Sequence, residues 1–266
     1  MRGKAFTLVE LLIVIAVIAV LVSILMPVLR TVREQGRGIV CGSNLKQLAL
    51  ALTTYAQDNE TFPQGFDDFS YLFIAPPGGY VGNAVYDKMG WWWFHFLPDI
   101  LLGEYEKGTI LWCPSRFIQD TGFKENILCG NYGVNRAICK DAPGMISGEF
   151  VGQSYSLYEI RRPAETLLIT DSGYSLISWR GAINASLVSF GHAAREGSFY
   201  VPGLRINEYR DIFPGQEADA IGGRHLNKSV NVGFADGHLS RLKADDLLVE
   251  LIDGEYSNRS PLWLPK

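Results

Sequence analysis

The sequence lacks a surplus of basic charge and has few cysteines. Its 266 residues include 24 Lys or Arg and 28 Asp or Glu, for a formal net charge of −4 at pH 7. Nucleic-acid binders carry basic patches, so we expect no nucleic-acid partner. Four cysteines in a chain of this length exclude a small disulfide knot, and a 47% hydrophobic share excludes a disordered chain. The composition is that of a folded protein of one or two domains.

Short motifs of common enzymes are also lacking. The chain contains no P-loop, dinucleotide fingerprint, HExxH or nucleophile elbow. It has no internal repeat or low-complexity tract, and no clear linker divides residues 60–266. We therefore expect a single head in this region and no enzymatic activity.

A long apolar run is present near the N-terminus. Residues 11–29 carry no charge, and as a helix they cover about 28 Å, close to the ~30 Å hydrocarbon core of a membrane. The run is too long for a secretory signal peptide, and no small-residue cleavage site follows it. A plain signal anchor is one interpretation. Its charge bias is weak, because basic residues flank both sides: Arg2 and Lys4 before the run, and Arg30, Arg33 and Arg37 after it.

A second interpretation comes from the run of letters FTLVELL at residues 6–12. This segment resembles the signal of type IV prepilins and type II secretion pseudopilins, which has a short basic leader and Glu as the fifth mature residue. The resemblance implies a leader over residues 1–5, cut by a prepilin peptidase between Ala5 and Phe6, and N-methylation of Phe6. The family usually has Gly where this chain has Ala5. Pro27 matches the helix-kinking proline of pilin stems.

Glu10 supports this resemblance on physical grounds. A carboxylate within an apolar span costs about 2.5–3.5 kcal/mol on insertion scales and normally has a partner. Cleavage would expose an ammonium group on Phe6, so Glu10 of one subunit could pair with the Phe6 amine of its neighbour. Such a pair sets register more than it adds stability. We therefore expect Glu10 to act in filament assembly.

The segment after the apolar run is predicted to continue as a helical stem over residues 30–59. One face of that helix carries apolar residues at spacings of 4, 3, 4 and 3, namely Cys41, Leu45, Leu48, Leu52 and Tyr55. The helix should kink at Pro27 and end near Asp58. Glycines between positions 36 and 42 weaken its middle.

Residues 60–266 are predicted to form a β-rich head. Apolar runs between turn signals read as strands at 166–170, 186–190, 198–201 and 230–235. Asp236-Gly237 predicts a type I′ turn after the last of these. The expected fold is α+β: a long N-terminal helix, with a transmembrane part at 6–29 and an amphipathic part at 30–59, packed on a pilin-like head.

Part of the head carries a second resemblance. Residues 223–238 resemble a C-terminal motif of prepilin-like proteins, in which nine residues separate His from Asp-Gly; here ten residues separate His225 from Asp236. Pro163 to Asp171 also resembles that group. A divalent-metal site is one hypothesis for four of these residues, Asp171, His225, Asp236 and His238.

The resemblance to pseudopilins makes Ca²⁺ conceivable there, although calcium prefers all-oxygen ligands. The alternative is structural: Asp236 caps its own turn and His225 hydrogen-bonds a backbone carbonyl. A tethered enzyme would need a cleft that holds Asp171, His225 and Asp236 together. We favour the structural interpretation and predict no metal or cofactor.

Two further groups of residues remain open. Trp91, Trp92 and Trp93 could form an exposed surface that stacks on sugars, or they could be core. Four cysteines in an exported head permit disulfides or reduced core thiols. Cys129 and Cys139 are close in sequence, and a bond from Cys41 to Cys113 would join stem to head.

The resemblance implies a structural subunit of a type II secretion-like pseudopilus or type IV pilus-like filament. About 207 head residues favour a minor subunit. Implied partners are a prepilin peptidase, other pilins, an inner-membrane assembly platform and membrane lipid. The chain would cross the bacterial inner membrane once, with its N-terminus in the cytoplasm and its head in the periplasm or on an extracellular filament. The alternative is a membrane-tethered protein whose head binds glycan or a secretion substrate, which exposed tryptophans would favour.

Overall fold

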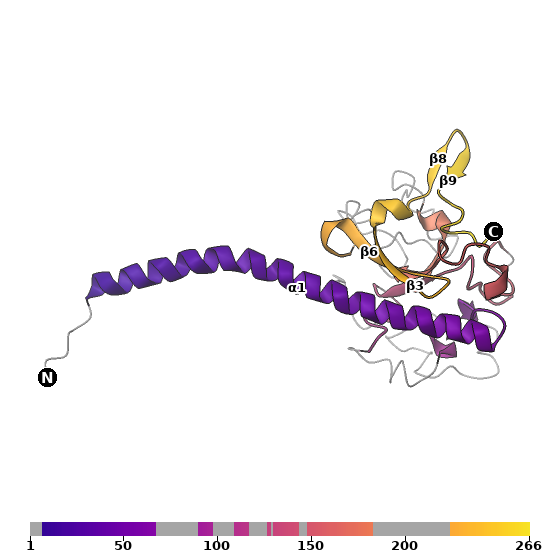
Figure 1. The fold of residues 1–266 in the computed structure, drawn as a ribbon, viewed down its shortest axis with the longest axis horizontal. Helices are drawn as coiled ribbons and strands as arrows, with labels where there is room; N and C mark the ends of the chain where they lie inside the picture. The colour runs from indigo at the N-terminus through magenta and orange to yellow at the C-terminus, as the bar shows by residue number, and fades with distance from the viewer. Residues whose placement is uncertain are drawn as a thin grey trace.

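The structure is a computed structural model of residues 1–266. It describes residues 7–67, 90–97, 109–116, 127–128, 130–143, 148–182 and 224–266. A long helix, α1 (Leu8–Asp58), projects from a head that is built around a mixed β-sheet (Figure 1). This arrangement confirms the predicted α+β, pilin-like architecture.

Helix α1 begins at a capping box and ends where the sequence predicts. Thr7 is the N-cap, and its hydroxyl accepts a hydrogen bond from the backbone N–H of Glu10 at 3.3 Å. The Glu10 carboxylate in turn accepts one from the backbone N–H of Thr7 at 2.8 Å. The helix ends at Asp58, and Asn59 N–H donates to the carbonyl of Tyr55.

The helix is continuous through Pro27. Figure 1 shows its N-terminal half as a smooth curve without a break. The predicted kink is therefore not a sharp one, which is consistent with a proline whose single missing hydrogen bond is absorbed by gentle curvature.

The C-terminal half of α1 packs against the head. Four residues of the predicted apolar stripe, Cys41, Leu45, Leu48 and Leu52, are fully buried, and Tyr55 is half-buried with its ring 6.2 Å from that of Phe96. The glycines at 36–42 do not melt the helix, because tertiary packing of this face compensates for their low propensity.

The central sheet has five strands in the order β5-β3-β4-β6-β7. Their bounds are β3 Tyr132–Asn135, β4 Leu167–Asp171, β5 Leu176–Ile177, β6 Ser229–Phe234 and β7 Leu239–Lys243. All pairs are antiparallel except β3 with β5. Helix α1 packs across β4, β6 and β7. The predicted strands at 166–170 and 230–235 are confirmed.

Smaller elements complete the described head. Two short ladders pair β1 (Phe66–Asp67) with β2 (Trp91–Trp92) and β8 (Glu250–Ile252) with β9 (Glu255–Ser257). Single 3₁₀ turns lie at η2 Trp93–Phe96, η4 Leu157–Glu159, η5 Trp179–Ala182, η7 Leu226–Lys228 and η8 Ala244–Leu247. The predicted strands at 186–190 and 198–201 lie outside the described residues.

The hairpin between β6 and β7 is present, but its predicted turn type is wrong. Phe234 N–H donates to the carbonyl of His238, and Gly237 N–H donates to that of Phe234. A type I′ turn would need positive φ at both Asp236 and Gly237, and only Gly237 has it, at +83°. The connection is a three-residue loop, a type I turn followed by glycine in the left-handed region.

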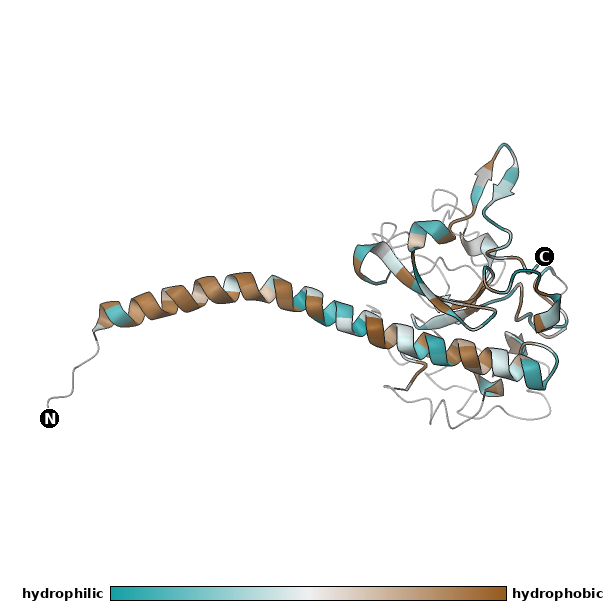
Figure 2. Ribbon diagram, viewed as in Figure 1, coloured by the Kyte–Doolittle hydropathy of each residue, from teal (hydrophilic) through white to brown (hydrophobic). Residues whose placement is uncertain are grey.

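The N-terminal half of α1 projects away from the described part of the head (Figure 1). Figure 2 shows most residues of this half coloured as hydrophobic. The large apolar side chains of residues 8–32 are 42–79% exposed. In the described part of the chain, α1 is the one helix long and apolar enough to span a membrane, judged by length and composition.

Candidate functional site

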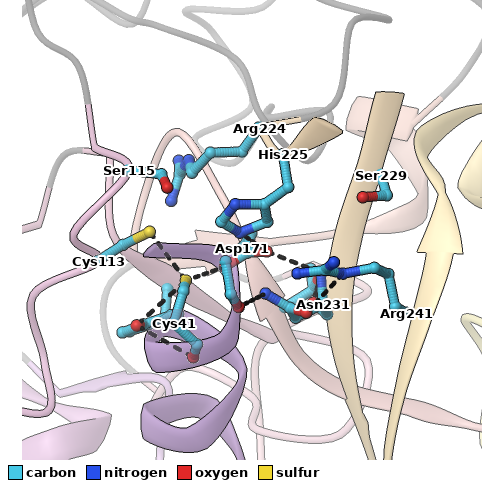
Figure 3. A network of polar contacts seen from close by, with 12 residues as sticks. Cys41, Cys113, Ser115, Asp171, Arg224, His225, Ser229, Asn231 and Arg241 are labelled. Carbon is cyan, nitrogen blue, oxygen red and sulfur yellow. Dashed lines mark hydrogen bonds and ion pairs between the residues drawn. The ribbon is translucent and has the colours of Figure 1, made fainter. Parts of the chain in front are cut away.

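A buried polar cluster lies where α1 meets the sheet (Figure 3). Cys41 comes from α1 and Cys113 from the segment 109–116. Asp171 is the last residue of β4, and His225 precedes β6. None of these four residues is more than 5% exposed. The fold thus brings together four titratable side chains that are far apart in sequence.

The four side chains are in mutual contact. The sulfur atoms of Cys41 and Cys113 are 2.8 Å apart. The Cys41 thiol lies 2.9 Å from Asp171 Oδ1, and His225 Nε2 lies 3.0 Å from Asp171 Oδ2. One atom from each residue can be chosen so that all four lie within 4.8 Å of one another.

Asp171 is the centre of the cluster. Besides His225 and Cys41, its carboxylate accepts a 2.7 Å hydrogen bond from the backbone N–H of Asn231 on β6. Burial opposes its ionisation. The hydrogen bond and charge of His225, the charge of Arg224 and the Asn231 N–H outweigh burial and lower the pKa of Asp171. The carboxylate is therefore ionised.

The two thiols differ in their ionisation. Burial, followed by the hydrogen bond with Cys113 and the Asp171 charge, raises the pKa of Cys41. Burial also opposes ionisation of Cys113, but the hydrogen bond from Cys41 and the charge of Arg224 lower its pKa overall. Cys113 is the more readily ionised sulfur, and Cys41 keeps its proton.

Arg224 supplies positive charge beside Cys113. Its guanidinium donates to the backbone carbonyls of Asn131, at 2.6 Å, and of Ser172. Burial opposes its charged form, yet the negative character of Cys113 and Asp171 raises the pKa of Arg224 overall. The Asn131 side chain accepts from the backbone N–H of Cys113 at 3.0 Å, which holds the segment in place.

The second nitrogen of His225 faces the stem. Nδ1 is buried and has no hydrogen-bond partner among the described residues. The Glu34 carboxylate is 3.8 Å away, and Gly38 of α1 lies beside the ring. The sequence interpretation that His225 hydrogen-bonds a backbone carbonyl is wrong for the side chain, because its Nε2 contacts Asp171. Only its backbone pairs with Ser229.

The arrangement fits metal coordination better than nucleophilic catalysis. Sulfur, imidazole nitrogen and carboxylate oxygen are the donors that a zinc-type ion takes. A thiol nucleophile would need an imidazole within hydrogen-bond reach of its sulfur and access for a substrate. Here Nε2 of His225 contacts Asp171, Nδ1 contacts no thiol, and all four residues are buried.

The other two predicted metal candidates are elsewhere. Asp236 and His238 lie in the turn that follows the C-terminal end of β6 and leads into β7. Asp236 Oδ1 accepts from the His238 backbone N–H at 3.0 Å and contacts its ring at 2.6 Å. The His238 ring stacks on Phe234. The set of four predicted residues is therefore split, and Asp236 caps its own turn as the structural alternative predicts.

Of the predicted cysteine pairs, one is in contact in the structure. Cys41 and Cys113 meet at the junction of stem and head, but as free thiols and not as a disulfide. Cys139 is also a free, fully buried thiol. Cys129 lies outside the described residues, as do Ala5 and Phe6 of the predicted processing site.

The tryptophan run does not form an exposed surface. Trp92 and Trp93 are no more than 1% exposed, and only Trp91 is half-buried. The Trp92 ring packs on Phe66 at 4.6 Å between centroids, and the Trp93 indole N–H donates to the Ser175 carbonyl. The proposed sugar-stacking platform is wrong for these two residues, because their large apolar rings are core of the head.

A helix that packs on a β-sheet head over its C-terminal half and projects from it over its N-terminal half gives the chain a pilin-like architecture. Residues 1–26 match the model of the prokaryotic N-terminal methylation motif, which implies processing by a prepilin peptidase. Residues 30–100 match a family described as "Protein of unknown function (DUF1559)". Comparison with curated proteins and with solved structures finds no match.

Proposed function

We propose that the protein is a structural subunit, and a minor one, of a type II secretion-like pseudopilus or type IV pilus-like filament, and not an enzyme. The observation that carries this proposal is the exposed apolar half of α1. Its large apolar side chains at residues 8–32 are 42–79% exposed, and this part of the helix projects from the head.

Such a surface requires an apolar environment. Full burial of one Leu, Ile or Val side chain is worth about 1.5–3 kcal/mol. The exposed side chains are apolar on all sides of the helix and not along one stripe. A helix of this kind is normally covered on every side by lipid or by other protein. Lipid meets this requirement before assembly, and a bundle of neighbouring stems meets it afterwards.

Glu10 gives the stem a point of registration. In the single chain its carboxylate is held at the helix start by the N–H and hydroxyl of Thr7, both at 2.8 Å. Cleavage before Phe6 places a new ammonium group one residue from Thr7. The carboxylate is thus already oriented toward the end of the stem, where the Phe6 amine of a neighbour can compete for it.

The topology and partners follow from this proposal. The stem crosses the bacterial inner membrane once, with the leader in the cytoplasm and the head in the periplasm or on an extracellular filament. Besides the peptidase, the partners are other pilins and an inner-membrane assembly platform. The size of the head suits a subunit present in few copies. The alternative, a tethered glycan-binding head, loses its main support because Trp92 and Trp93 are buried.

The test compares the wild type with Glu10→Ala and, as a matched control, Glu255→Ala, an exposed head carboxylate in β9. Each is expressed with a prepilin peptidase and an assembly platform. Intact mass measures leader cleavage and methylation. Electron microscopy with immunolabelling of sheared filaments measures incorporation into filaments. We expect all three to lose residues 1–5 and gain a methyl group on Phe6, and only Glu10→Ala to be absent from filaments. Processed wild type that never enters a filament would overturn the proposal.

A further inference from the structure

We propose that Cys41, Cys113, Asp171 and His225 bind one Zn²⁺ ion, which fixes the stem helix to the head. This inference goes beyond the filament role and does not depend on it. The four donor atoms are two sulfurs, one carboxylate oxygen and the Nε2 atom of His225. Structural zinc sites take four ligands of these types in a closed, tetrahedral arrangement.

The spacing of the donors suits a small cation. With zinc bonds of ~2.3 Å to sulfur and ~2.0–2.1 Å to nitrogen or oxygen, tetrahedral donors lie roughly 3.3–3.8 Å apart. The closest pairs here are 2.8–3.0 Å apart, and the chosen set lies within 4.8 Å. Side-chain adjustments of under about 1 Å therefore reach the coordination geometry.

Few protons serve the hydrogen bonds of this cluster, and the Cys113 sulfur is also hydrogen-bonded to the Arg224 guanidinium. The single S–H of Cys41 faces two acceptors, the Cys113 sulfur at 2.8 Å and Asp171 Oδ1 at 2.9 Å. It can satisfy only one of them at a time. A cation held between the sulfurs and the carboxylate satisfies all of these lone pairs together.

The charges around the cluster also balance with zinc present. Two thiolates and one carboxylate carry three negative charges against the two positive charges of the ion. The guanidinium of the half-buried Arg224, beside Cys113, supplies the remaining positive charge. A buried site of this kind needs such compensation, because an uncompensated charge in the interior is costly.

The surrounding groups form the outer shell that zinc ligands usually have. A zinc-bound His commonly directs its other ring nitrogen to a carboxylate. The free Nδ1 of His225 has the Glu34 carboxylate 3.8 Å away. The backbone N–H of Asn231 fixes Asp171, and the side chain of Asn131 fixes the backbone of Cys113.

The ion that fits is zinc and not calcium, because calcium takes oxygen ligands and two of these four donors are sulfur. A disulfide between Cys41 and Cys113 is the competing use of the same thiols, and it would leave the Asp171–His225 pair as a separate contact. Since Cys41 belongs to the stem and the other three ligands to the head, zinc would set how the head is held on the stem helix.

The test measures zinc on the full-length protein, purified in detergent without chelator. Elemental analysis gives the metal per chain, and non-reducing peptide mapping with an alkylating reagent reads the thiols. We expect about one zinc ion per chain, with Cys41 and Cys113 alkylated only after a chelator is added. Cys113→Ser should lower zinc to background, whereas Cys139→Ala, which alters a buried thiol outside the cluster, should keep it.

Cobalt titration of the chelator-treated wild type provides a second readout that needs no variant to fold. Thiolate-to-Co²⁺ charge-transfer bands with intense tetrahedral visible bands are expected, and added zinc should abolish them. A protein without zinc whose Cys41 and Cys113 peptides are joined by a disulfide would overturn the proposal. So would zinc that persists in Cys113→Ser.

Discussion

Close contact at single residues decides how the stem lies on the sheet. A Cβ atom at Gly233 on β6 would come within 2.9 Å of Ala49 Cβ on α1 and of Ile169 Cγ2 on β4. We expect Gly233→Ala to destabilise the protein by about 1–3 kcal/mol, because overpacking forces the helix away from the sheet.

Gly36→Ala is the control for Gly233→Ala. Gly36 is exposed within α1 and a Cβ there meets no atom within 4 Å, so helix propensity predicts stabilisation by about 0.5–1 kcal/mol. Urea midpoints of the full-length protein in detergent, read by tryptophan fluorescence, measure both effects. Equal shifts in the two variants would contradict this account.

His95 makes the stability of the head depend on pH. The residue is 6% exposed, and its Nδ1 accepts a hydrogen bond from the backbone N–H of Trp92 at 2.9 Å. Burial lowers its pKa from 6.5 to about 3. Below pH 6.5 the unfolded chain therefore binds a proton that the folded chain does not, and stability falls as the pH drops toward 3.

From pH 7 to pH 5 this one group should cost about 2 kcal/mol, at ~1.36 kcal/mol per pH unit. His95→Gln keeps an acceptor for Trp92 N–H and cannot titrate, so it should lose this part of the pH dependence. Urea unfolding at the two pH values measures the difference between the variants. An unchanged pH dependence in His95→Gln would show that His95 is charged in the fold.

At the residue scale, the sequence predicted those members of the polar cluster whose residue types were distinctive. It did not predict contacts between residues that are far apart in the chain. Asp171 and His225 were candidates, and they do meet. For Cys41 and Cys113 the sequence left open a disulfide or reduced core thiols, and no spacing in the sequence links either of them to Asp171. Arg224 was not predicted, because a lone arginine gives no signal until the fold places it beside Cys113.

At the scale of elements, the buried stripe of α1 is the main contact between stem and head. Leu48 is fully buried against the head and Leu50, two residues on, is 45% exposed. We expect Leu48→Ala to destabilise the protein by about 2–5 kcal/mol through the cavity it leaves. Leu50→Ala should cost clearly less, since much of that side chain is already in solvent.

Thermal unfolding of both leucine variants in detergent, followed by near-UV circular dichroism, checks this prediction. Comparable losses in the two variants would mean that the face of α1 that packs on the head has been assigned incorrectly.

Elements with a strong periodic signal were predictable and those without one were not. The 3.6-residue pattern of the stem predicted the end of α1, and the alternation in residues 230–235 predicted the bounds of β6 to within one residue. Strands β3 and β5 were missed because they have only four and two residues, too few to show a pattern. No element was predicted for the tryptophan run, in which the chain passes from β2 into η2 after Trp92.

On the scale of the whole molecule, α1 belongs to two environments. At 51 residues it is about 75 Å long, and only its C-terminal part is covered by the head. This division was visible in the sequence, because the uncharged run ends before the amphipathic stripe begins. The placement of the head was not, since it depends on contacts between Cys41 and head residues 72 to 130 positions away in the chain.

The most direct test of the filament account is to ask what surrounds the projecting half of α1 in assembled cells. A photoreactive amino acid replaces Val17, which is 53% exposed in the middle of the apolar run. The same group at Tyr158, 91% exposed on the head, is the control. The account predicts that Val17 cross-links to the stem of another pilin-type subunit, its own copy or a different one, and that Glu10→Ala abolishes the product. Irradiation that yields no protein adduct at Val17 in cells that display filaments would contradict it.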